Sequence, residues 1–104
     1  LAIENQKKIH KNVDVYLVHM GDKVIPTAVK IANDLRKHCG KTVILETLRR
    51  SLKAQMREAG RSNAKTTLIL GEDELIENII IIKDMDTGYQ EKIPLSEVIQ
   101  YINS

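Results

Sequence analysis

Three short, nearly uninterrupted apolar runs alternate with helical patterns, and this alternation constrains the fold more than any other feature of the sequence. The runs cover residues 13–20, 42–47 and 66–70, and β-branched residues are frequent in each. Runs of this length and composition are typical of strands that are buried on both faces. Two segments with apolar residues at spacings of three and four separate them. The order strand–helix–strand–helix–strand predicts a parallel sheet with right-handed crossovers.

Both predicted helices carry start and stop signals. Pro26 suits the first turn of the first helix, and Gly40 is a natural stop after it. Ser51 can cap the second helix, which ends at Gly60 and Asn63. The buried stripe of the first helix is predicted to comprise Val24, Ala28, Ile31, Ala32 and Leu35, and that of the second Leu52, Met56 and Ala59.

The pattern changes after residue 71. Residues 79–82 and 89–93 are strand-like, and the turn signal at 86–88 between them predicts an antiparallel hairpin. Ser96 can cap a final helix. We therefore expect an α/β fold, a five-stranded mixed sheet with three helices, over residues 13–104. Residues 1–12 are polar and are expected to be a linker from an upstream domain; the start at Leu1 suggests a piece of a longer protein.

Composition excludes several classes of function. No apolar run approaches the roughly 20 residues that a membrane-spanning helix needs, so no membrane partner is predicted. The single cysteine, Cys39, excludes an internal disulfide and a cysteine-rich zinc site. Neither a Gly-x-Ser-x-Gly motif nor a P-loop is present. We predict no catalytic residue, no metal site and no cofactor in this chain.

Charge is unevenly distributed along the sequence. Residues 41–65 hold seven basic and two acidic residues, whereas residues 72–92 hold seven acidic and two basic ones. One interpretation is a solvated helix face followed by an acidic turn. The other is a basic patch for a polyanion, next to carboxylates that accept hydrogen bonds.

The predicted topology favours a binding site at one edge of the sheet. Ligands of open α/β sheets bind at the carboxyl ends of the parallel strands, where segments 19–23, 47–51 and 71–74 should lie. The second segment leads into a helix start, and cationic groups beside free backbone N–H groups suit a phosphate. Its candidate residues are Thr47, Arg49, Arg50, Ser51 and Lys53.

The third segment supplies carboxylates. Gly71 is followed by Glu72 and Glu74, whose ionised side chains only accept hydrogen bonds. A guanine offers two adjacent N–H donors on its Watson–Crick edge, and unpaired RNA bases are read on such edges. The alternative is that these residues form the acidic first turn of a short helix. Aromatic residues for base stacking are few: the sequence has three tyrosines and no Phe or Trp.

Three sequence blocks carry a resemblance to a known family. They are Arg-Ser-Leu-Lys-Ala-Gln-Met at 50–56, Leu-Ile-Leu-Gly-Glu-Asp-Glu-Leu at 68–75 and Ile-Lys-Asp-Met-Asp-Thr-Gly at 82–88. In sequence and spacing they resemble the C-terminal anticodon-binding domain of histidyl-tRNA synthetase, within the class II synthetase anticodon-binding superfamily. The resemblance covers residues 14–102.

The resemblance implies a fold that agrees with the one predicted above, and it implies a function. The domain would bind the anticodon loop of histidine tRNA, while a catalytic domain outside this sequence charges the tRNA with histidine. The parent would be a cytoplasmic, homodimeric histidine-tRNA ligase using ATP and Mg²⁺. Two alternatives stay open: the synthetase-like regulatory subunit of ATP phosphoribosyltransferase, and a stand-alone α/β nucleotide-binding module.

Overall fold

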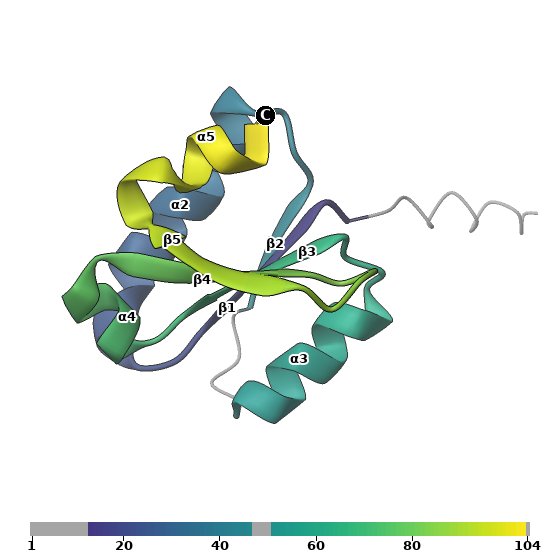
Figure 1. Ribbon diagram of the computed structural model, residues 1–104, viewed down its shortest axis with the longest axis horizontal. Helices are drawn as coiled ribbons and strands as arrows, with labels where there is room; N and C mark the ends of the chain where they lie inside the picture. Colours follow the sequence, from purple (N-terminus) through teal and green to yellow (C-terminus); the bar gives the residue numbers. More distant parts are fainter. Residues whose placement is uncertain (1–12, 47–50, 104) are drawn as a thin grey trace, which may run out of the picture.

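The fold is built on one five-stranded mixed sheet, seen in a computed structural model that describes residues 13–46 and 51–103 (Figure 1). Strand β1 is parallel to β2 and β3, β4 is antiparallel to β3, and β5 is antiparallel to β4. The order across the sheet is β2-β1-β3-β4-β5, so the predicted parallel unit and added hairpin are confirmed. The strands are β1 (Val15–His19), β2 (Val43–Leu45), β3 (Thr66–Leu70), β4 (Ile79–Asp84) and β5 (Gln90–Pro94).

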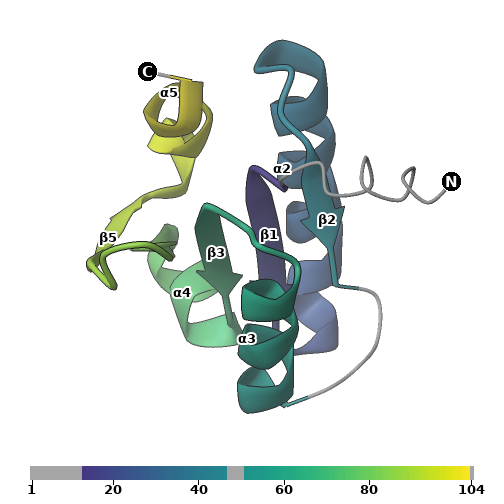
Figure 2. The same cartoon turned by 90° about the vertical axis from the view of Figure 1, so that its right-hand side faces the viewer.

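Helices cover both faces of the sheet, with α3 on one face and α2 and α5 on the other (Figures 1 and 2). The described residues form four α-helices, one more than the three expected. The addition is the six-residue helix α4, whose only apolar residues, Leu75 and Ile76, are adjacent and so show no helical period in the sequence. The helical elements are η1 (Asp22–Val24), α2 (Ile25–His38), α3 (Leu52–Arg61), α4 (Glu72–Glu77), η2 (Leu95–Glu97) and α5 (Val98–Asn103).

Alternation along the central strands divides the core into two layers. Val15 and Leu17 of β1 point to the α2 side, whereas Tyr16 and Val18 point to the α3 side. Because successive side chains of a strand point to opposite faces, each layer takes every second residue. The predicted stripe of α2, from Val24 to Leu35, is buried as expected.

The predicted stripe of α3 is partly wrong. Ala59 is buried and Met56 packs against the core, but Leu52 is 37% exposed. Gln55 is instead the residue of the helix's first two turns that is fully enclosed, with 1% exposure. The most enclosed position in the amino-terminal half of α3 is thus occupied by a polar residue. The hydrogen-bond partners of Gln55 lie at His19, the last residue of β1.

Candidate functional site

The carboxyl ends of the three parallel strands lie side by side, as the topology predicted. His19 at the end of β1 pairs with Leu70 at the end of β3. The Met20 N–H donates to the Leu70 carbonyl at 3.1 Å, and the Glu46 N–H donates to the Leu17 carbonyl at the same distance. The chain segments that follow the three strands therefore start from one edge of the sheet, which we call the carboxyl edge.

The predicted cationic residues are described only in part. Thr47, Arg49 and Arg50 lie outside the described residues. Ser51 is the N-cap of α3, since its Oγ accepts a hydrogen bond from the Ala54 N–H at 3.2 Å. Lys53 follows in the first turn with an exposed side chain. No ion-pair partner for Lys53 is found among residues 13–46 and 51–103, so its charge is available to a ligand.

Gly71 and Glu74 together begin helix α4. The Glu74 Oε1 accepts a hydrogen bond from the Gly71 N–H at 2.9 Å, which is the carboxylate half of a capping box. The structure therefore agrees with the alternative that these acidic residues start a short helix. Glu74 has a structural partner of its own, and Gly71 is buried beneath it.

Glu72 lies across the neighbouring connection and contacts Gly21. A Cβ at Gly21 would come within 2.4 Å of the Glu72 Oε2, so the carboxylate occupies the space that a larger residue would fill. Gly21 has a φ of 98° and a ψ of 140°, a backbone conformation that essentially only glycine adopts. Both residues are exposed, and this contact brings the first and third connections of the carboxyl edge together.

Three residues of this edge were not predicted as site residues: His19, Glu46 and Gln55. The Gln55 Oε1 accepts from the His19 N–H at 3.1 Å, and its Nε2 donates to the His19 carbonyl at 2.9 Å. The His19 ring Nε2 lies 2.6 Å from the Glu46 carbonyl oxygen. For Gln55, the helical spacing in the sequence could have indicated a buried position, since it lies three residues after Leu52 and four before the buried Ala59.

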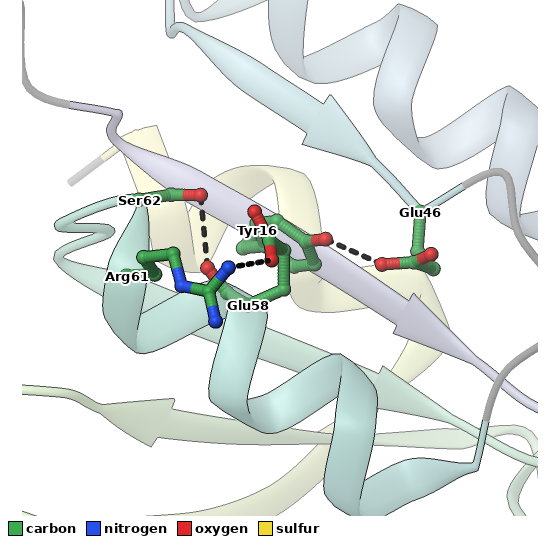
Figure 3. A network of polar contacts seen from close by, with 5 residues as sticks. All are labelled: Tyr16, Glu46, Glu58, Arg61 and Ser62. Atoms are coloured by element: carbon green, nitrogen blue, oxygen red, sulfur yellow. Dashed lines mark hydrogen bonds and ion pairs between the residues drawn. The ribbon is translucent and has the colours of Figure 1, made fainter.

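Glu46 also contributes a buried carboxylate, at 3% exposure. The hydroxyl of Tyr16, on the adjacent strand, donates to this carboxylate (Figure 3). Burying a charged group is costly unless it is hydrogen-bonded, and the Tyr16 hydroxyl provides such a bond. Figure 3 also shows the far end of α3, where Glu58 pairs with Arg61 at 3.5 Å.

The exposed tyrosines lie at the opposite edge of the sheet. Thr66 at the start of β3 pairs with Asp84, and the turn from β4 to β5 therefore lies at the amino ends of the parallel strands. There the hydroxyls of Tyr89 and Tyr101 donate to the two oxygens of Glu91, at 3.1 and 2.8 Å. Their hydrogen bonds to the Glu91 carboxylate raise the pKa of both tyrosines.

The described residues contain neither a metal centre nor a membrane span. In residues 13–46 and 51–103, no three His, Cys, Asp or Glu side chains are grouped so that they could hold a metal ion. No helix in those ranges combines the length and the apolar character that crossing a bilayer requires. The carboxyl edge instead offers an exposed ammonium, exposed carboxylates and a capped helix start, which suit a polar, charged ligand.

Comparison with known proteins gives one family. A family model described as "Anticodon binding domain" matches residues 14–104, which include every strand and helix described above. Histidine–tRNA ligase of Bacillus cytotoxicus is 46% identical over 103 residues, and that of Thermosipho africanus is 37% identical over 102 residues. These matches cover 98% and 95% of this chain, respectively. The chain spans about a quarter of the length of these relatives, 24% in each case.

Comparison with solved structures gives the same family. Apo histidyl-tRNA synthetase of S. aureus superposes with a TM-score of 0.81 at 40% identity, over 88% of this chain and 27% of that one. The RNA-binding domain of threonyl-tRNA synthetase from Cryptosporidium parvum has a TM-score of 0.76 at 19% identity, which supports the fold alone.

Proposed function

This chain belongs to the anticodon binding domain family, and we propose that it binds the anticodon loop of histidine tRNA. The observation that carries the proposal is the family match over residues 14–104, together with relatives that are histidine–tRNA ligases at up to 46% identity. Lys53 at the carboxyl edge is exposed and has no ion-pair partner within residues 13–46 and 51–103. It supports the proposal, because phosphate contacts supply much of the affinity of proteins for nucleic acids.

Under this proposal, cationic residues at the start of α3 hold the RNA backbone. Lys53 lies in the first turn of a helix whose N-cap is Ser51. Arg49 and Arg50 precede it in sequence, and Thr47 precedes them. Guanidinium and ammonium groups in this part of the chain would contact phosphates, fixing the position of the loop without reading its sequence.

Glu72 is our candidate for base reading. Its carboxylate is exposed, whereas Glu74 already accepts a hydrogen bond from the Gly71 N–H. A carboxylate close to RNA phosphates is unfavourable unless it gains a specific partner, and a guanine edge offers two N–H donors. The anticodon GUG supplies two guanines. Gly71 and Glu74 would then support the turn that presents Glu72.

The remaining functions belong to a parent protein. We propose a cytoplasmic, homodimeric histidine-tRNA ligase in which a separate catalytic domain, using ATP and Mg²⁺, attaches histidine to the bound tRNA. This chain would position the tRNA and take no part in the chemistry. The comparisons do not favour the regulatory subunit of ATP phosphoribosyltransferase, since the relatives described above are histidine–tRNA ligases.

Titration with a synthetic anticodon stem-loop tests the proposal. The chain should bind the GUG stem-loop, and Lys53→Ala should weaken matched and mismatched loops alike while lowering the salt slope by about one. Lys37→Ala is the matched control, because Lys37 is an exposed lysine near the end of α2, on the other side of the sheet. Equal, small effects of both variants would contradict phosphate binding at α3.

A second titration tests base reading. Glu72→Gln should lose preference for guanine over inosine, which lacks the exocyclic amino donor, and should keep much of the electrostatic affinity. Good hydrogen-bonded edges give about 1–3 kcal/mol of discrimination in DNA readout. Glu74→Gln is the companion variant, expected to lower helix stability more than base preference. A Glu72→Gln variant that discriminates as well as the parent would exclude Glu72 as a reader.

A further inference from the structure

The hydrogen-bond ladder between β1 and β2 changes partner at the carboxyl edge. The Val15 N–H donates to the Thr42 carbonyl at 3.1 Å, and the Glu46 N–H donates to the Leu17 carbonyl at 3.1 Å. Parallel ladders repeat every two residues along a strand. The next bond in this series would run from the His19 N–H to the Glu46 carbonyl, and the His19 carbonyl would accept from the second residue after Glu46.

Gln55 takes both of these positions. Its Oε1 accepts from the His19 N–H and its Nε2 donates to the His19 carbonyl, at 3.1 and 2.9 Å. A primary carboxamide has the same acceptor and donor as a peptide group. The side chain, at 1% exposure, therefore supplies the acceptor and the donor that two successive peptide groups of a continued β2 would supply. Among the described residues, the last pair in the β1–β2 register is Leu17 with Leu45.

The Glu46 carbonyl, which loses the His19 N–H as a partner, binds the His19 ring instead. The ring Nε2 lies 2.6 Å from this carbonyl oxygen. His19 of β1 therefore bonds to two neighbouring elements. Its backbone forms hydrogen bonds with Gln55 of α3, and its side chain contacts the Glu46 carbonyl at the end of β2. Helix α3 carries Lys53 of the proposed RNA-binding surface two residues before Gln55. Glu46 directly precedes the candidate residue Thr47 in sequence.

We propose that Gln55 and His19 are positioning residues that fix Lys53 and Glu46 relative to one another for RNA binding. This inference rests on the proposed function. A side chain that takes over a ladder position sets the place of its helix more tightly than apolar packing alone, since two hydrogen bonds define both distance and direction. Loss of the pair should raise the cost of ordering the surface when RNA binds.

The test uses two substitutions of Gln55 in this chain and one matched control. Gln55→Met keeps the length of the side chain and removes both hydrogen bonds. Gln55→Glu accepts from the His19 N–H at neutral pH but donates to the His19 carbonyl only when its carboxyl is protonated. Gln100→Met is the control, because Gln100 is exposed on α5. The probe is the GUG anticodon stem-loop, titrated well below the unfolding temperature of each variant.

We expect Gln55→Met to weaken stem-loop binding about tenfold, equivalent to about 1.4 kcal/mol, with Gln100→Met unchanged. The affinity of Gln55→Glu relative to the parent should recover as the pH is lowered, because the protonated carboxyl restores the missing donor. Gln55→Met has no titratable group at this position and should show no such recovery relative to the parent. A folded Gln55→Met variant with parental affinity, or a flat profile for Gln55→Glu, would overturn the inference and leave the proposed function intact.

An RNA-independent measurement separates the two ideas. In the free protein, backbone NMR resonances of Glu46 and Lys53 should shift in Gln55→Met and in His19→Ala, and stay in place in Gln100→Met. If the parent fails to bind the stem-loop, the proposed function is wrong. The positioning of Glu46 and Lys53 is then judged by these shifts alone, and unchanged resonances would overturn it. If Gln55→Met does not fold, the pH profile of Gln55→Glu decides.

Discussion

Replacing Gly21 with alanine should destabilise the fold through two separable effects. The first is backbone strain, because φ is 98° and ψ is 140° at this residue. Residues held in such glycine-only regions cost about 1–3 kcal/mol each. The second is steric, since the new Cβ would lie 2.4 Å from the Glu72 Oε2 and 2.7 Å from its Cγ. Moving that flexible side chain off its preferred rotamer costs about 0.5–1.5 kcal/mol.

Urea denaturation of a double-mutant set measures the two parts. Gly21→Ala should lower the free energy of unfolding by the sum of both effects. In a Glu72→Ala background only the backbone part should remain, because the atoms that crowd the new Cβ are gone. The difference between the two backgrounds is the steric part.

Gly60→Ala is the matched control, with the opposite sign. Gly60 lies in α3, and a Cβ there would meet no atom within 4 Å. Alanine in a helix is about 0.5–1 kcal/mol more favourable than glycine, so this variant should unfold at higher urea. Equal stabilities of Gly21→Ala and the parent would refute the strained backbone. If Gly21→Ala lowers the free energy of unfolding in the parent but not in the Glu72→Ala background, the effect is entirely steric and the backbone is not strained.

Three further predictions concern other parts of the fold. Thr67→Val should be neutral or raise stability by about 1 kcal/mol in thermal unfolding, because the buried Thr67 Oγ1 has no hydrogen-bond partner among the described residues. Ser51→Ala should lower stability by about 1 kcal/mol through loss of the α3 N-cap, with Ser51→Gly costing less. Glu91→Gln should lower the pKa of Tyr89 and Tyr101, measured by tyrosinate absorbance. Because folding raises both pKa values from 10.0, the parent's free energy of unfolding should fall as the pH rises above that value.

Periodicity predicted the elements whose formation depends on apolar burial. The stripe of α2 and the strand at Thr66–Leu70 are found as expected, because the apolar residues of the stripe and of the strand are buried in the two core layers. The class of fold followed from the order of these elements. The short helix α4 was offered only as an alternative, since its two apolar residues, Leu75 and Ile76, are adjacent and give no helical spacing. Its capping pair, Gly71 and Glu74, was the signal in the sequence that indicated a helix start.

Burial of Gln55 could not be read from apolar periodicity. Pattern reasoning assigns enclosed helix positions to apolar residues, so Leu52 was placed in the buried stripe and Gln55 was not. What buries Gln55 is the pair of hydrogen bonds to the His19 backbone, a partner that is 36 residues away in sequence. The assignments of Thr47, Arg49 and Arg50 stay predictions, because these residues lie outside the part of the chain that the structure describes.

Departures from regular structure differ in kind between the two edges of the sheet. At the amino edge, the positive φ values of Asn63 and Gly88 occur where the chain must turn, after α3 and within the β4–β5 hairpin. At the carboxyl edge, Asn78 also has an ordinary left-handed φ after α4, but Gly21 adopts a conformation outside that region, and the Gln55 side chain takes the hydrogen bonds of a neighbouring strand's backbone. Strain and irregular pairing persist only where the surrounding structure determines them, and they concentrate at functional sites. The carboxyl edge is therefore where a fold of this size holds its least regular geometry, and there Glu72 and Lys53 are presented to solvent.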